Sequence, residues 1–310
     1  MLPAVTITYI SHTACLEHET GGDHPESRQR LYAIEDALIS AGLMNLLQRA
    51  DAPRVTREQL CRVHSAAYVD EIEHRISHSG LARLDADTVT GPHSLEAARR
   101  AAGAAVLGVD RVMSGEAASA FCAIRPPGHH ASRSTAMGFC IFNNVAVGAA
   151  HALAAGLDRV AIVDFDVHHG NGTESIFQHD DRVLLCSVFQ HPCYPDTRLV
   201  EDCDHIVHAP LPAGAYSEDF QQAVQQHLLP ALHGFRPELI LVSAGFDAHF
   251  EDTMSEVNLL DSDYHWITRE IMDAAGQHAE GRVVSTLEGG YESSALGRSV
   301  VQHIRALMQV

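Results

Sequence analysis

Short apolar runs alternate with longer amphipathic segments along most of this chain. The apolar runs predict strands at residues 5–10, 118–124, 160–166, 183–189, 239–246 and 282–289. Segments with a helical pattern predict helices at residues 26–49, 65–78, 94–113, 143–156, 217–235, 261–279 and 293–309. Strands that are apolar throughout and alternate with helices are typical of a parallel sheet covered on both faces. The pattern therefore predicts an α/β fold.

The helix starts and the continuity of the pattern give two further expectations. Ser65 and Ser94 stand where a serine side chain caps the first turn of a helix. The chain shows no internal repeat and no low-complexity linker that would separate two domains. We therefore expect one domain that extends over residues 1–310.

Four of the predicted strands lead directly into polar or titratable side chains. The strand at 118–124 is followed by Arg-Pro-Pro-Gly-His-His, and the strand at 160–166 runs into Asp-Phe-Asp-Val-His-His. The strand at 239–246 leads into Asp247, and the strand at 282–289 leads into Glu-Gly-Gly-Tyr. Ligands of parallel α/β sheets bind beyond the carboxyl ends of the strands, so these side chains are expected to line one site.

The charge of the chain narrows the class of partner. The 310 residues include 40 acidic and 21 basic side chains, which give a formal net charge of -19. This negative charge argues against a nucleic-acid partner and favours the approach of cationic substrates. The 22 histidines are numerous, so a histidine on its own indicates little.

The cysteines and the longest apolar stretch bear on location. Seven scattered cysteines without a Cys-x-x-Cys pair fit a reducing, cytoplasmic environment better than a disulfide framework. The run at 145–157 is too short to span a bilayer and contains His151. We therefore expect a cytoplasmic protein without a membrane segment.

The stretch that contains Asp164, Asp166 and His168 carries the strongest chemical signal. Alternate residues of a strand face the same side, so these three side chains share a face if the extended backbone persists. Two carboxylates and an imidazole side by side require a compensating positive charge. Together with Asp247, these residues provide oxygen and nitrogen ligands and no thiolate. Three protein ligands with open coordination positions are typical of catalytic zinc. A divalent ion lowers the pKa of its bound water to about 7.

Four side chains could act beside such a metal. His129 and His130 follow a rigid Pro-Pro-Gly turn and can serve as general base and general acid, or as ligands. Asp164, where it does not bind the metal, can orient an imidazole. Tyr291 follows two glycines and can offer its phenol to an oxyanion. Each motif alone is weak evidence, and together they predict a metal-dependent hydrolase.

Five long motifs resemble the zinc-dependent histone deacetylase and acetylpolyamine amidohydrolase family. They are IRPPGHHA (124–131), GFCIFNNVAVGA (138–149), VAIVDFDVHHGNGTESIF (160–177), SAGFDAH (243–249) and LEGGYE (287–292). Asn171 and the LEGGY motif resemble the class II branch, which includes bacterial histone deacetylase-like amidohydrolases. The resemblance implies an arginase-like fold with a parallel sheet of about eight strands between helices.

The resemblance also implies roles for the polar residues. It implies that Zn²⁺ is bound by Asp166, His168 and Asp247. His129 and His130 would carry out acid–base work, with His130 as the general base. The remaining catalytic residues that it implies are Asp164, which would orient His129, Asn171, which would contact His130, and Tyr291, which would hydrogen-bond the scissile carbonyl.

Two further sites follow from the same resemblance. The substrate-binding tunnel would be lined by Gly138, Phe139, Tyr194 and Met254. A structural K⁺ ion would be bound, mostly through backbone carbonyls, by Asp164, Asp166, His168, Ser187 and Val188. The implied activity is removal of acetyl or other short acyl groups from lysine side chains of proteins or peptides.

Three alternatives stay open from the sequence. The substrate could be an acetylated polyamine, which the acidic charge would suit equally. A binuclear manganese enzyme of the arginase type shares the fold but needs an additional Asp where this chain has His249, so one catalytic metal is expected. A non-catalytic acyl-lysine binding protein is the third, and the oligomeric state is left open.

Overall fold

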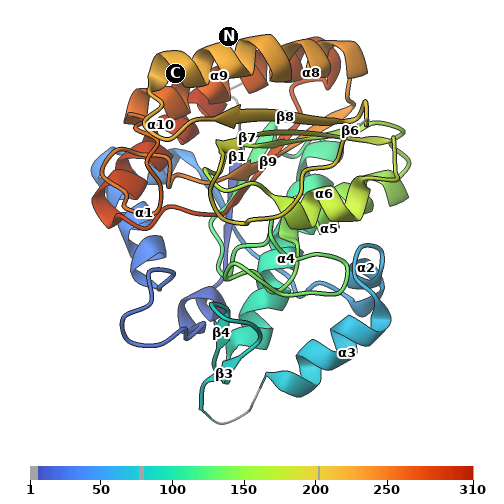
Figure 1. Cartoon of the computed structure of the whole chain (residues 1–310), viewed down its shortest axis with the longest axis vertical. Coiled ribbons are helices and arrows are strands. Elements are labelled where there is room, and N and C mark those ends of the chain that lie inside the picture. The colour runs from blue at the N-terminus through green and yellow to red at the C-terminus, as the bar shows by residue number, and fades with distance from the viewer. Residues whose placement is uncertain (1–5, 77–79, 202, 310) are drawn as a thin grey trace.

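The computed structural model describes residues 6–76, 80–201 and 203–309, and its centre is a twisted parallel sheet (Figure 1). Eight strands pair in the order β2-β1-β5-β10-β9-β6-β7-β8, and each neighbouring pair is parallel. Their bounds are β1 Ile7–Ser11, β2 Gln48–Asp51, β5 Ser119–Cys122, β6 Val160–Asp164, β7 Val183–Gln190, β8 Ile206–Leu211, β9 Leu239–Ala244 and β10 Val283–Leu287. A separate hairpin pairs β3 Ala82–Arg83 with β4 Val89–Thr90.

Helices cover both faces of this sheet. Figure 1 shows α8, α9 and α10 on one side of the sheet and α4, α5 and α6 on the other. The α-helices are α1 Gln29–Ser40, α2 Arg57–Cys61, α3 Ala66–Arg75, α4 Ser94–Met113, α5 Asn144–Ala154, α6 Asn171–Phe177, α7 Ser217–Ala223, α8 Leu229–Phe235, α9 Asp261–His278 and α10 Ser293–Met308. A π-helical turn at Val224–Leu228 joins α7 to α8.

Five of the inner strands are buried along their whole length, as their sequences predict. Every residue of β5, β6, β7, β9 and β10 is buried. A strand that contacts helices on both faces has no side for polar residues, which is why these strands read as continuous apolar runs. The predicted parallel sheet with helices on both faces is confirmed.

Several boundaries differ from the sequence-based expectation. The helix predicted at 26–49 ends at Ser40, because Gly42 adopts φ +72° and the chain then enters the edge strand β2. The other edge strand, β8, contains Pro210 and exposed positions, so its sequence does not resemble a strand. Both edge strands contain residues that are not buried, which hides the pattern that marks the inner strands.

The two predicted helix caps have different outcomes. Ser65 caps α3 as predicted, since its hydroxyl accepts from the backbone N–H of Tyr68 at 3.1 Å. Ser94 is the first residue of α4 rather than its cap, and its hydroxyl instead accepts from the backbone N–H of Gly91 at 2.8 Å. Among the described residues, no helix combines the length and the hydropathy that crossing a bilayer requires.

Candidate metal and catalytic site

The four strands that end in polar residues are consecutive in the sheet, in the order β5-β10-β9-β6. Their carboxyl ends therefore deliver the polar segments to one edge, as the sequence predicts. A cavity of about 210 Å³ opens there. Its lining residues are Asp87, Pro127, His129, His130, Gly138, Phe139, His168, Tyr194, Met254, Gly289 and Tyr291.

Three buried side chains form what we call the first cluster: Asp166, His168 and Asp247. His168 Nδ1 lies 3.1 Å from Asp166 Oδ1 and 3.1 Å from Asp247 Oδ2. The other oxygen of each carboxylate is fixed by the backbone, because Gly289 N–H donates to Asp166 Oδ2 at 2.8 Å and Val167 N–H donates to Asp247 Oδ1 at 3.0 Å. His168 Nδ1, Asp166 Oδ1 and Asp247 Oδ2 therefore lie close together, in positions from which they can bind one ion.

The donor set of the first cluster fits a divalent metal. Zn²⁺ with bonds of about 2.0–2.2 Å holds tetrahedral ligand atoms about 3.3 Å apart, close to the separations found here. His168 Nδ1 carries at most one proton and cannot donate to both carboxylates fully. Burial and the neighbouring Asp166 raise the pKa of Asp247 to about 6, and a bound cation would stabilise the charged carboxylate.

The strand geometry around Asp164 corrects one expectation. Strand β6 ends at Asp164, so Asp164, Asp166 and His168 do not share one extended face. Instead, the backbone N–H of Asp166 donates to Asp164 Oδ1 at 3.1 Å, and that of His168 donates to Asp166 Oδ1 at 2.9 Å. These side-chain-to-backbone bonds turn the chain. The turn separates Asp164 from the other two residues.

The two adjacent histidines have different partners. His129 Nδ1 lies 3.0 Å from Asp164 Oδ2, whereas His130 Nδ1 lies 2.8 Å from the amide oxygen Oδ1 of Asn171. The rings lie 4.0 Å apart between centroids. The structure therefore brings together the pairs His129–Asp164 and His130–Asn171 that the family resemblance implies.

These partners shift the two pKa values in opposite directions. Burial disfavours a charged His129, but the carboxylates of Asp164 and Asp166 raise its pKa to about 10. Burial and the positive charges on His129 and His168 hold the pKa of His130 well below its usual range. One imidazole is thus held protonated and the other neutral, an arrangement that suits acid–base catalysis.

Tyr291 reaches the cavity from a turn that only glycine can form. A side-chain carbon at Gly289 would lie 2.1 Å from Asp247 Oδ2, and Gly290 adopts φ +115°. The guanidinium of Arg30 lies 5.0 Å from the centre of the Tyr291 ring. Burial raises the pKa of Tyr291 well above its usual range, so the phenol keeps its proton. It remains a donor at neutral pH.

The four residues expected to contact substrate line the cavity, and their role stays a prediction. Phe139 packs edge-on against Tyr291 at 5.8 Å, and Tyr194 packs edge-on against His130 at 5.2 Å between centroids. Gly138 and Met254 complete the lining. Apolar and aromatic walls around a polar end suit a narrow aliphatic chain.

The K⁺ site also stays a prediction. Asp164 on β6 lies opposite Ser187 on β7 in the sheet register, which places the expected residues in neighbouring strands. His249, the position at which a binuclear manganese site would need an Asp, does not join the first cluster. Its Nε2 pairs with Asp261 at 3.1 Å instead.

Sequence reasoning missed three carboxylates that hold the site together. Asp252 Oδ2 accepts from the backbone N–H of Tyr291 at 2.6 Å and of Glu292 at 3.0 Å. Glu288 Oε2 accepts from the backbone N–H of Gly128 at 2.6 Å and of His129 at 3.1 Å. Glu288 lies in the LEGGY motif among the strand-end residues named from the sequence, and that position was the signal that could have revealed its role.

The third missed carboxylate is Asp87. Its Oδ1 accepts from the backbone N–H of Gly138 at 3.1 Å, and the Thr88 hydroxyl accepts from the N–H of Phe139 at 3.2 Å. Phe139 has φ +67°, a conformation that favours glycine, so these bonds hold a strained backbone in place. No local pattern marks Asp87, because its partners lie about fifty residues further along the chain.

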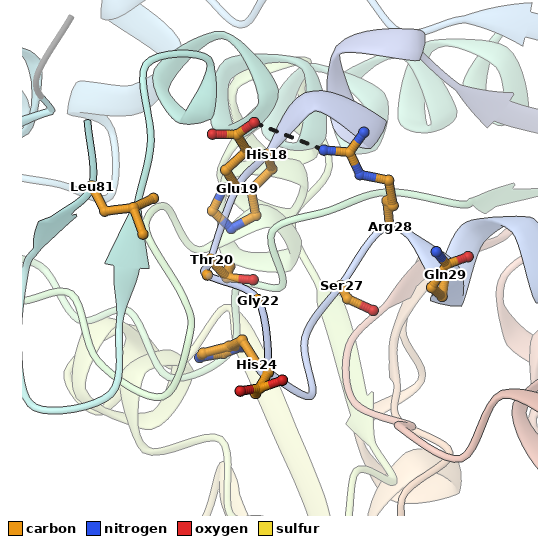
Figure 2. Close-up of a pocket in the computed structure, with 11 residues that line it drawn as sticks. His18, Glu19, Thr20, Gly22, His24, Ser27, Arg28, Gln29 and Leu81 are labelled. Atoms are coloured by element: carbon orange, nitrogen blue, oxygen red, sulfur yellow. Dashed lines mark ion pairs between the residues drawn. The ribbon is translucent and has the colours of Figure 1, made fainter. Parts of the chain in front are cut away.

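Another pocket lies outside this site. It measures about 510 Å³ and is formed mainly by the loop at 18–29, with Leu81 opposite. Figure 2 shows the Glu19–Arg28 ion pair, 3.9 Å long, across its rim. His24 links the pocket to the site, because its ring packs against Phe139 at 4.6 Å and its Nε2 lies 3.2 Å from the carbonyl oxygen of Asp87.

Comparison with known proteins adds independent information. A profile of the histone deacetylase domain matches residues 24–307. An uncharacterised protein of Synechocystis is 40% identical over 309 residues, which cover 97% of this chain and 99% of that protein. A histone deacetylase-like amidohydrolase of Pseudomonas aeruginosa is 39% identical over 293 residues, which cover 91% of this chain and 76% of that protein.

The fold has a close counterpart among solved structures. The crystal structure of the HDA15 HD domain matches with a TM-score of 0.92 and 32% sequence identity, and the match covers 98% of this chain and 90% of that one. This match confirms the predicted arginase/deacetylase-like fold.

Proposed function

The chain belongs to the histone deacetylase family, and we propose that it is a zinc-dependent amidohydrolase that removes acetyl or other short acyl groups from lysine side chains. The observation that carries this proposal is the convergence of the first cluster, the His129–His130 pair and Tyr291 on one cavity of about 210 Å³. The family supports the coarser statement of a hydrolase that acts on amides.

The first cluster would hold the zinc ion. Asp166 Oδ1, His168 Nδ1 and Asp247 Oδ2 are the atoms that face the common point. Bound there, Zn²⁺ supplies Lewis-acid activation of the amide carbonyl and of a water molecule. The backbone bonds to the outer carboxylate oxygens fix the two ligands before the ion arrives, which limits the cost of ordering them.

The histidine pair would move protons. His130 Nδ1–H donates to Asn171, which leaves its Nε2 free to accept a proton from the attacking water. His129 is held protonated by Asp164 and adds positive charge beside the site where the oxyanion forms. A proton held on this pair then passes to the leaving amine nitrogen, so water supplies the hydroxyl of the acid and a proton for the amine.

Tyr291 would stabilise the charge that develops on the carbonyl oxygen. Its phenol is protonated and faces the cavity, and Asp252 anchors its backbone. A donor held in place before the reaction needs no reorganisation when the oxyanion forms. Phe139 and Tyr194 would flank the aliphatic part of the substrate, and Met254 would form another wall.

The remaining expectations accompany this proposal. Residues 1–310 would form one catalytic domain, located in the cytoplasm, where its seven free cysteines stay reduced. K⁺ would bind beneath the zinc site at Asp164, Asp166, His168, Ser187 and Val188. Partners would be acylated proteins, peptides or polyamines rather than nucleic acids, since the net charge is -19.

A substrate panel tests the proposal. Zinc-loaded protein is incubated with acetyl-, propionyl- and butyryl-lysine peptides and with acetylspermidine, with and without a chelator. We expect turnover of the acetyl-lysine peptide that stops with chelator and returns with Zn²⁺. The chain contains no lysine of its own, so every deacetylated lysine comes from the added substrate.

Each other outcome has a defined meaning. A higher kcat/KM for acetylspermidine than for any peptide would replace the lysine substrate by a polyamine. Binding of acyl-lysine peptides by zinc-loaded protein without any turnover would make the chain a recognition protein. Full turnover in the metal-free protein would contradict the zinc mechanism.

A further inference from the structure

A second group of three potential metal ligands lies beside the catalytic cavity but does not line it. This second cluster consists of His169, which follows β6, Glu174 on α6 and His208 on β8. Glu174 Oε2 lies 3.0 Å from His169 Nε2 and 2.5 Å from His208 Nε2. Among the described residues, these and the first cluster are the two groups whose ligand atoms gather in this way.

The outer atoms of the second cluster are already engaged. His169 Nδ1 lies 3.3 Å from the Ser187 hydroxyl, and the His169 ring packs on Phe189 at 4.5 Å between centroids. Glu174 Oε1 accepts from the backbone N–H of Val200 at 3.1 Å. Contacts of this kind fix a metal-binding imidazole or carboxylate from behind. They leave His169 Nε2 and Glu174 Oε2 to share a partner.

The negative charge of Glu174 is buried and needs compensation by a positive charge or by hydrogen bonds. Glu174 is buried, and a buried carboxylate is costly unless positive charge or hydrogen bonds compensate it. In the part of the chain that the structure describes, its ion-pair partners are His169 and His208, with no arginine among them. The compensation therefore comes either from protons on the two histidines or from a metal ion between the three side chains.

We propose that the second cluster binds a second divalent cation of the zinc class. Two imidazoles and one carboxylate are a set that Zn²⁺ accepts with its fourth position open. The His208 side chain is 14% exposed, so solvent reaches that position. Tetrahedral zinc holds its ligand atoms about 3.3 Å apart. To bind zinc together, Glu174 Oε2 and His208 Nε2 must therefore move further apart, by less than about 1 Å.

The position of this ion suggests a structural role. It would join the loop after β6, helix α6 and the edge strand β8, which are otherwise linked here by hydrogen bonds. His169 directly follows His168, so the ion would also restrict the backbone of His168 in the first cluster. The two ions would therefore differ in function, and one catalytic metal per chain is retained.

Metal stoichiometry tests the proposal. Protein stripped with chelator is dialysed against Zn²⁺, and the bound zinc is counted by elemental analysis. We expect two zinc ions per chain in the native sequence and one in Glu174→Gln and in His208→Asn. His205→Asn is the matched control, because His205 is also partly buried near β8 but contacts the Phe177 carbonyl and should leave the count at two.

A second measurement keeps the test valid where a variant of the second cluster fails to fold. Asp247→Asn removes a ligand of the first cluster, so zinc that this variant still binds reports on the second. We expect one zinc ion per chain and a higher melting temperature on adding Zn²⁺. No zinc in Asp247→Asn together with one in the native sequence would overturn the proposal and leave a hydrogen-bonded triad. That outcome would leave the proposed deacylase activity unaffected, because the substrate panel tests this activity separately.

Discussion

The first and second clusters use neighbouring residues of one loop and face different surroundings. His168 faces the cavity, where Tyr194 and Tyr291 line the walls. His169 packs against Phe189 and lies between helix α6 and strand β8. The first cluster has open volume, two imidazoles with opposite pKa shifts and a phenol within the same cavity. Among the described residues, the second cluster consists of its three ligands and the contacts that fix them. None of these three ligands lines the catalytic cavity.

A set of metal ligands therefore does not by itself define a catalytic centre. Both clusters offer three side chains that suit Zn²⁺. Catalysis also needs space for a substrate and groups that move protons in reach of the reacting atoms. Variants that remove one requirement at a time can separate the two clusters by experiment.

The largest effect is expected from Asp247→Asn. Losing one carboxylate of the first cluster removes the zinc ion, so hydrolysis of an acetyl-lysine peptide should fall to the background rate. The assay is kcat/KM together with zinc content. Asp180→Asn changes a partly exposed carboxylate that pairs with Arg182 and serves as the control. Substantial activity in Asp247→Asn would mean that Asp247 is not a zinc ligand.

Tyr291→Phe should come next. It removes one oxyanion donor and should lower kcat by about 10²–10³-fold while zinc content and melting temperature stay close to the native values. Tyr194→Phe removes a hydroxyl from the same cavity and should lower kcat by much less. Equal losses in both variants would show that Tyr291 has no special role.

The pH dependence should separate the two histidines. His130 must be neutral to accept a proton, so kcat/KM should rise with pH through its depressed pKa and stay high at neutral pH. His129 must stay protonated, so activity should fall as the pH rises through about 10. Asn171→Asp places a carboxylate against His130, raises its pKa and should move the acidic limb to higher pH. An unchanged acidic limb would remove His130 from the role of base.

The smallest effect on catalysis is expected from Glu174→Gln. This variant removes the carboxylate of the second cluster and should lower the melting temperature by several degrees, since it costs about 1–3 kcal/mol of unfolding free energy. Its kcat/KM should fall by less than about 10-fold, because the change reaches His168 only through the backbone. A loss as large as that of Asp247→Asn would mean that the second cluster takes part in catalysis.

Much of the fold follows from local patterns in the sequence. The inner strands β5, β6, β9 and β10 are mostly apolar, because helices bury both of their faces. The polar residues after each run mark the edge at which a site forms. The edge strands β2 and β8 escaped prediction because one side of each lies in contact with solvent or polar residues.

Local sequence patterns establish which residue types stand at the strand ends, and the motifs add the expected zinc ligands. Which atoms meet depends on the tertiary structure. Asp166 and Gly289 are 123 residues apart, and Glu288 holds the backbone of Gly128 across 160 residues. Contacts of that range depend on the order in which strands pair, which no local periodicity encodes. The end of β6 at Asp164, the anchoring by Asp252 and the meeting of His208 with Glu174 are therefore decided by the fold.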